Sequence, residues 1–310
     1  MNTTVFDPEF EKYYIVYIVA LCSVAVAAFG WRVAAACAVT AVVGHATAVL
    51  ASRMRGERPF RRGAVLWAAL PLALPAATPL WALATGAVFG ETVVRQLFGG
   101  YGRNIVNPLA VAVVFLGVSY PAIITGAETM PGSQPAAGFT RWASDGAACP
   151  VLPQCSLASR FLVLDAPVTP GSLSPLLAVA GLGLLWRRRA FHAAFPAGAV
   201  AGLALTLTVQ SLLGRPTAIP AIDTLVADGG FLIALAAAGL DPYSLARTPA
   251  VRLPGGLLFG GLFALLVRVQ GAVPAGFSAL LLTNLVTPLA DACVVARRAR
   301  QWIVAVGRIT

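Results

Sequence analysis

Apolar runs recur along the whole chain, separated by short stretches rich in arginine, glycine or proline. Runs of this length can cross about 30 Å of hydrocarbon as helices. We expect ten spans, near residues 13–30, 32–52, 64–78, 80–97, 106–125, 172–186, 195–213, 219–240, 254–270 and 273–292. The pattern therefore predicts an all-α polytopic membrane protein.

Composition supports this prediction, and the charge pattern gives it an orientation. Hydrophobic residues make up 58% of the 310 residues, and the mean hydropathy is +0.82. The net charge of +10 comes from 22 basic residues, 21 of them Arg. They sit in short clusters between spans, which argues against nucleic-acid binding. With both termini inside, 17 basic residues face one side and 5 the other, so we expect both termini in the cytoplasm.

The acidic-leaning head before the first span lacks the basic start and cleavage site of a signal peptide, so we expect it to be retained. The longest polar interval, residues 127–171, is expected to form an extracytoplasmic loop. We expect a single membrane domain, 1–310, in which this loop separates a first repeat, residues 1–126, from a second repeat, residues 172–310. Cys149 and Cys155 lie in this loop, where a disulfide and two free thiols both remain open.

A repeated sequence motif relates the two halves. NIVNPLAVAVV at 104–114 resembles NLVTPLADACVV at 284–295, with five spans between equivalent points. An odd number of spans per repeat makes the halves inverted, although coincidence remains an alternative. Prolines are expected to break helices in both halves, at Pro71, Pro75, Pro79, Pro108, Pro242 and Pro288. We expect the broken segments to meet near the midplane and to create a polar pocket.

The stretch FGGYGRNIVNPLA at 98–110 is the leading candidate site, because irregular backbone does not face lipid. Gly99, Gly100 and Gly102 allow positive φ and a close approach to a ligand. Asn104 and Asn107 add donors and acceptors beside them. A tight turn with an asparagine cap is the alternative.

Carboxylates provide further candidates. Glu91 and Arg95 are four residues apart on one predicted helix, so we expect them to pair, either along an ion pathway or as a structural pair. Asp228, before a glycine pair, and Asp241, before a proline, are candidates for a helix cap, a cation ligand or an acceptor for flavin N–H groups.

Other residues suggest no independent chemistry. Asp291 is expected to pair with Arg297 or Arg298 at the cytoplasmic end. His45 and His192 have no Cys, Asp or Glu at ligand spacing, so we expect no metal site. The sequence shows no Ser-His-Asp arrangement, no phosphate-binding loop and no dinucleotide-binding G-x-G-x-x-G after a strand, which argues against a self-contained hydrolase or dehydrogenase.

Four stretches, in matching order, resemble the NqrB/RnfD family, the membrane subunits of ion-translocating NADH:quinone and ferredoxin:NAD oxidoreductases. They are FGGYGRNIVNPLA (98–110), GSLSPLLAVAGLGLLWRRR (171–189), ADGGFLIALAAAGLDPYS (227–244) and PAGFSALLLTNLVTPLAD (274–291). The resemblance implies a ten-helix, urea-transporter-like fold in a bacterial cytoplasmic (inner) membrane. It also implies a flavin, and partner subunits that carry iron-sulfur clusters and flavin.

Members of this family attach FMN through a phosphoester to the Thr of an S/T-G-A-T motif. Here the corresponding stretch is DAPVTP, residues 165–170, in which Thr169 matches the acceptor while Ala166 and Pro167 replace the usual Ser and Gly. A second alignment makes Ser172 the acceptor. FMN at Thr169, FMN at Ser172, and no covalent flavin all remain open, as does noncovalent riboflavin. Leu240 also departs from the family, which usually has Thr before the Asp-Pro pair.

The resemblance thus implies a flavin-carrying membrane subunit of an electron-transport complex, one that couples electron flow to Na⁺ or H⁺ movement and is not catalytic alone. Two alternatives remain: a small-solute channel or transporter on the same inverted fold without a redox cofactor, and a flavin-free scaffold.

Overall fold

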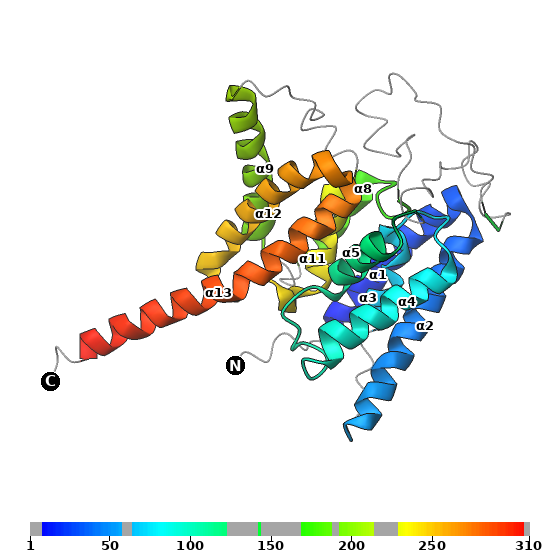
Figure 1. Ribbon diagram of the computed structural model, residues 1–310, viewed down its shortest axis with the longest axis horizontal. Coiled ribbons are helices and arrows are strands. Elements are labelled where there is room, and N and C mark those ends of the chain that lie inside the picture. Colours follow the sequence, from blue (N-terminus) through cyan, green and yellow to red (C-terminus); the bar gives the residue numbers. More distant parts are fainter. Residues whose placement is uncertain are drawn as a thin grey trace.

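The computed structural model describes residues 8–57, 64–122, 142–143, 169–187, 192–213 and 229–306, and these ranges contain helices and loops but no strand (Figure 1). Five of the described helices are long and apolar enough to cross a membrane, namely α1, α2, α9, α12 and α13. This confirms the all-helical membrane class.

The first half contains α1 (Pro8–Phe29), α2 (Trp31–Met54), α3 (Ala64–Ala68), the 3₁₀ turn η3 (Pro71–Ala73), α4 (Leu80–Gly90), the π-helical turn η4 (Glu91–Gln96) and α5 (Pro108–Ser119). The second half contains α8 (Pro175–Arg187), α9 (Ala194–Leu212), α11 (Gly230–Leu240), the 3₁₀ turn η6 (Pro242–Ser244), α12 (Pro249–Gln270) and α13 (Ala272–Val306).

The third expected span, 64–78, is not a continuous helix. It consists of the five-residue α3 and the short turn η3, followed by extended backbone at Leu74. Pro71, Pro75 and Pro79 each remove a backbone donor, which stops the helix. The guanidinium of Arg32 donates to the carbonyls of Ala77 (2.9 Å) and Thr78 (3.3 Å). A side chain from α2 thus satisfies carbonyls that the break leaves free.

The expected break at Pro288 is wrong, because α13 continues through it. The helix runs for 35 residues, well beyond the predicted end at 292, and its far end projects from the body (Figure 1). Near the proline, the hydroxyl of Thr287 donates to the carbonyl of Thr283 (2.7 Å). Threonine side chains and packed neighbours commonly let a membrane helix accommodate a proline.

Asp291 also differs from expectation. Its carboxylate accepts hydrogen bonds from the backbone N–H groups of Arg247 (2.8 Å) and Thr248 (3.0 Å). These groups lie at the start of α12, where a negative charge is favoured by the helix dipole. Asp291 therefore caps α12 from α13, and the described ion pairs do not include one with Arg297 or Arg298.

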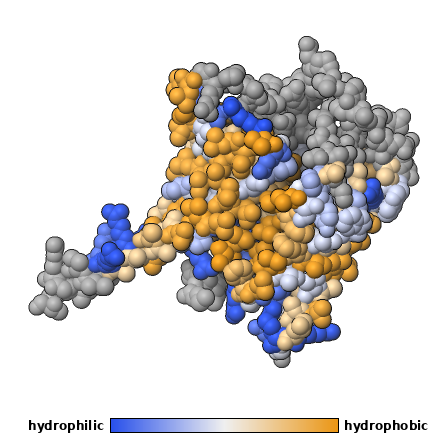
Figure 2. Space-filling model, viewed as in Figure 1, coloured by the Kyte–Doolittle hydropathy of each residue, from blue (hydrophilic) through white to orange (hydrophobic). Residues whose placement is uncertain are grey.

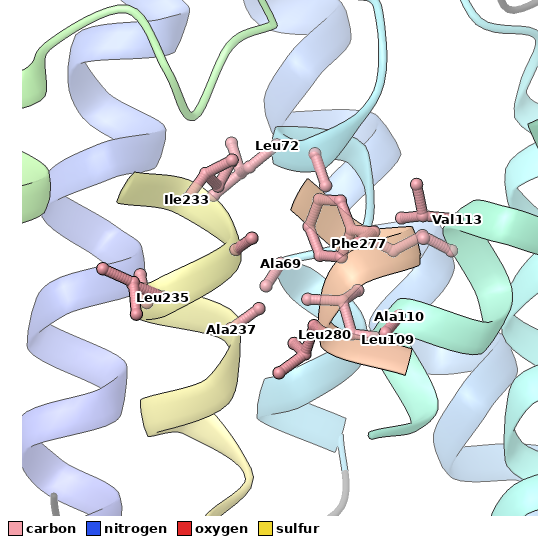
Figure 3. Packing of buried hydrophobic residues seen from close by; sticks show 14 of the residues in the cluster. Ala69, Leu72, Leu109, Ala110, Val113, Ile233, Leu235, Ala237, Phe277 and Leu280 are labelled. Atoms are coloured by element: carbon pink, nitrogen blue, oxygen red, sulfur yellow. The ribbon is translucent and has the colours of Figure 1, made fainter. Parts of the chain in front are cut away.

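Packing joins the two halves through α5, α11 and α13. Apolar side chains from these helices and from α3 and η3, among them Ala69, Leu109, Ala237 and Phe277, fill the space between them (Figure 3). The outer face carries apolar residues over α12, α13 and their neighbours, while hydrophilic surface gathers toward the far end of α13 (Figure 2). A continuous apolar exterior is what lipid contact requires.

The tightest helix contact lies between α9 and α12. A Cβ atom built on Gly256 would lie 2.1 Å from the carbonyl oxygen of Phe195, and one on Gly260 would lie 1.9 Å from that of Ala199. Small residues let two membrane helices bring their backbones together. Gly255, beside them, has room for a methyl group, since its nearest neighbour would be 3.8 Å away.

This contrast gives a matched pair of variants. Gly256→Ala should force α9 and α12 apart and lower the free energy of unfolding by about 1–3 kcal/mol. Gly255→Ala should leave it unchanged or raise it, because alanine is the better helix former. Thermal unfolding of both variants in the same detergent measures the difference, and equal loss of stability would contradict the close α9–α12 contact.

Candidate functional site

Polar side chains gather where the start of α5, the end of α11 and the middle of α13 meet. We call this group the polar cluster. Its members are all buried in an otherwise apolar interior, with 0–2% of each residue exposed: Asn104, Asn107, Asp241, Ser244 and Asn284. Buried polar groups of this kind are retained only when they bond to one another or to a ligand.

Asn107 caps α5 and also links it to α11. Its Oδ1 atom accepts from the N–H groups of Leu109 (2.9 Å) and Ala110 (3.2 Å), while its Nδ2 donates to the carbonyl of Ala237 (2.8 Å). Pro108 follows at the first helical position, where its missing N–H costs nothing. The cap predicted as the alternative is therefore present, and the same carboxamide holds the two halves together.

Asn104 contacts Asp241 directly. Its Nδ2 donates to Oδ2 of Asp241 (2.6 Å) and to the carbonyl of Val106 (3.0 Å). The Oδ1 atoms of both residues are buried without a hydrogen-bond partner among the described residues. Asp241 makes no side-chain cap at either adjoining helix end, so its carboxylate is an acceptor between elements.

Asn284 completes the polar cluster from α13. With its carboxamide oriented to satisfy its neighbours, its oxygen accepts from the N–H of Asn107 (3.0 Å) and its nitrogen donates to the carbonyl of Ser244 (3.1 Å). The two copies of the repeated motif, 104–114 and 284–295, thus meet in space, as expected, although the second copy lies inside an unbroken helix. Asn284 was not predicted as a site residue, although it is the first residue of the second copy of the repeated motif, and that motif could have identified it.

The three glycines of the 98–110 stretch adopt the predicted conformations. Gly99, Gly100 and Gly102 have φ of 94°, 101° and 80°, a region that disfavours residues with a Cβ. A Cβ on Gly102 would lie 3.4 Å from the ring of Tyr243, so the close approach here is to a side chain of the second half.

Glu91 and Arg95 form the predicted pair at the π-helical turn η4. Arg95 Nη1 lies 3.3 Å from Glu91 Oε2, and each side chain is 2% exposed. The same carboxylate accepts from Trp67 Nε1 (2.7 Å) and from Gln96 Nε2. Sequence reasoning missed Trp67, which lies on another element, and Gln96, whose spacing of five residues from Glu91 would place it on a different side of a regular α-helix.

Two carboxylates and one guanidinium therefore share this interior. The charges of Arg95 and Glu91 both act on the buried Asp241. The guanidinium of Arg95 also lies over the ring of Tyr101, 4.9 Å from its centroid, a cation–π distance. If both carboxylates are ionised, the three groups together carry one surplus negative charge. An apolar interior disfavours such a charge unless a proton or a cation compensates it.

The candidate flavin acceptors lie at a different place, in the loop before α8. Thr169 and Ser172 are 7% and 1% exposed, and the Thr169 hydroxyl donates to that of Ser172 (3.0 Å). The loop is fixed to the first half by a bond from the N–H of Gly171 to the carbonyl of Leu72 (2.7 Å). Ser172 also packs against Gly229, which precedes α11.

Some predicted residues lie outside the described part of the chain. They are Asp228, Cys149, Cys155 and residues 165–168 of the flavin motif. The expected polar pocket differs from what the described residues form. Most polar side chains of the polar cluster bond to one another or to nearby backbone, and the cavity beside Ala69, Ile233 and Leu109 is lined mostly by apolar side chains (Figure 3).

Comparison with proteins of similar sequence shows the family of this chain. Residues 10–300 match the model of the NQR2, RnfD, RnfE family. Three similar proteins are each named as a subunit of the Na(+)-translocating NADH-quinone reductase. The one from Klebsiella pneumoniae is 31% identical over 72% of this chain and 57% of its own length.

The protein from Azotobacter vinelandii is also 31% identical, over 83% of this chain and 66% of its own length. That from Pseudoalteromonas atlantica is 31% identical over 87% of this chain and 68% of its own. The chain thus spans between about half and two thirds of the length of these relatives. With its apolar helices and the match over nearly its whole length, the chain is a multi-pass membrane protein that belongs to the NQR2, RnfD, RnfE family.

Proposed function

We propose that this chain is the flavin-carrying membrane subunit of an electron-transport complex, in which buried carboxylates couple electron transfer to the movement of Na⁺ or H⁺. The observation that carries the proposal is a pair of buried carboxylates, Glu91 and Asp241, that share the guanidinium of Arg95 inside a member of a family with Na⁺-translocating relatives. The proposal includes partner subunits with iron-sulfur clusters and flavin, and an inner-membrane location with both termini cytoplasmic.

Asp241 is the proposed ion-responsive group. Its unpartnered Oδ1 and that of Asn104 are buried oxygens, the ligand type that hard cations such as Na⁺ prefer, and either can also receive a hydrogen bond from a bound proton carrier. Because ionisable groups inside membranes mark ion and proton paths, Glu91 and Asp228 are proposed for the same path.

Neutralising Asp241 tests the coupling. In the complex reconstituted into liposomes, Asp241→Asn should lower the number of ions moved per electron by about tenfold, because an amide cannot take up the charge of a bound cation or proton. Electron transfer with the gradient dissipated should fall less. Ion uptake and electron transfer are measured in the same vesicles.

Asp291→Asn is the matched control, since Asp291 is a carboxylate on the neighbouring α13. The amide oxygen can retain the bond from the N–H of Thr248, while the bond from the N–H of Arg247 to the other oxygen is lost. It should leave the ratio unchanged. Equal ratios for the unmodified complex and for Asp241→Asn would contradict a role of Asp241 in coupling.

The flavin part of the proposal rests on the loop before α8. The hydroxyls of Thr169 and Ser172 fit the acceptor chemistry of a phosphoester, and Ser172 lies against the N-cap of α11. A phosphate is favoured at a helix N-terminus, where free N–H groups and the dipole both attract it. FMN supplies one- and two-electron chemistry when bound, while these residues would hold its phosphate.

Alanine variants distinguish the two acceptors. Thr169→Ala should abolish the flavin fluorescence that stays with the denatured polypeptide on a gel, whereas Ser172→Ala should retain it. Ser174→Ala serves as control, because Ser174 is a buried hydroxyl of the same loop that accepts from the N–H of Leu177 (3.3 Å).

Loss of fluorescence in Ser172→Ala alone would move the attachment to Ser172. If the unmodified chain is purified with its redox partners and its band is not fluorescent, the result would favour a flavin-free scaffold or a subunit that binds riboflavin noncovalently. A colourless chain that conducts a small solute in liposomes without partners would instead support a channel.

We further propose the ten-helix, inverted-repeat, urea-transporter-like arrangement. Its support is that the helix of the third expected span in each half, α3 or α11, is followed by a 3₁₀ turn that starts with proline, η3 at Pro71 and η6 at Pro242. Helices α5 and α13, the fifth of each half, pack against each other.

A further inference from the structure

The α1–α2 hairpin holds a pair of thiols apart from the polar cluster. Gly30, with φ of 94°, joins the two helices. Cys22 lies eight residues before it and Cys37 seven residues after it, so antiparallel packing brings them to one level. Their side chains lie within hydrogen-bonding reach of each other. Cys37 is buried in the apolar core, and Cys22 packs against that core.

The surroundings restrict what this pair can bind. Zinc in proteins takes four ligands in tetrahedral geometry, and the described residues contain no group of three or more His, Cys, Asp or Glu able to hold a metal. Soft monovalent ions with a filled d shell accept two sulfur ligands and prefer thiolate to oxygen. The number and the type of ligands therefore both favour such an ion.

We propose that Cys22 and Cys37 form a two-coordinate site for a soft monovalent cation of the copper(I) or silver(I) class. On binding, the S–H bond of one cysteine breaks, its sulfur forms a bond to the ion, and the proton leaves to water. The second thiol donates a sulfur lone pair without losing its proton. One proton is exchanged for one monovalent ion, so the site stays neutral, as its apolar surroundings require. No electron is transferred.

The test uses the full chain in detergent with Cys149, Cys155 and Cys293 changed to Ser, so that the pair supplies the remaining thiols. Titration with silver(I), which does not oxidise thiols under these conditions, should show a single saturable equivalent by calorimetry. Either Cys22→Ala or Cys37→Ala in this background should weaken binding by about 100-fold. Absence of the saturable equivalent, or equal affinity in the single variants, would overturn the proposal.

A second measurement avoids changes to the pair. In the same background without Cys149, Cys155 and Cys293, equimolar silver(I) should slow alkylation of Cys22 by a maleimide by about tenfold or more, as followed by mass spectrometry. Protection should disappear in Cys37→Ala. An unchanged alkylation rate of Cys22 would refute the site even if the alanine variants failed to fold. Neither readout depends on flavin or ion transport, so the site and the proposed function can fail separately.

Discussion

The architecture depends on one constraint: a helix that stops inside an apolar body must have its free backbone groups satisfied by the protein itself. The chain meets it mainly with carboxamides and one arginine. Asn107 satisfies two N–H groups at the start of α5 and one carbonyl near the end of α11. Asn284 bonds the N–H of Asn107 and the carbonyl of Ser244, and Arg32 satisfies the carbonyls after η3.

The same bonds determine where the charges lie. Because Asn107 and Asn284 connect α5, α11 and α13, the segments between these helices are brought to one level. Asp241 follows directly from the end of α11, and Asn104 precedes the start of α5, so they come within 2.6 Å of each other. The carboxylate proposed to respond to an ion is thus held by the bonds that join the two halves. A change in its charge would act on the contact between them.

Periodic features were predictable from sequence, and features set by distant contacts were not. The bounds of α2 and α9 and the end of α1 follow from continuous apolar runs, whereas α1 begins at Pro8, before its apolar run. The Glu91–Arg95 pair follows from spacing along one helix. Whether a helix ends at a proline was harder to predict. Three prolines in 71–79 end a helix, whereas α13 continues through Pro288, and the spacing of the prolines along the chain does not distinguish the two cases.

The residues of the candidate site show the same limit of prediction from sequence. Asn104, Asn107 and the three glycines stood out because their types are unusual between apolar runs. Trp67 did not, since an indole in an apolar run usually indicates packing. Its bond to Glu91 exists because the break after α3 and the packing of α2 against α3 and α4 place it there. Composition indicated which residues were unusual, and tertiary contacts determined their partners.

The π-helical turn at η4 explains how one carboxylate receives three donors. On an α-helix, residues five apart point about 140° away from each other, so Gln96 would face away from Glu91. The wider π-turn brings positions i, i+4 and i+5 to one side. Arg95 and Gln96 then both reach Glu91 from its own helix, while Trp67 reaches it from another. A carboxylate used only to balance Arg95 would need the i+4 contact alone, which a regular α-helix already provides. The local widening of the helix therefore provides further donors to Glu91, beyond its charge partner.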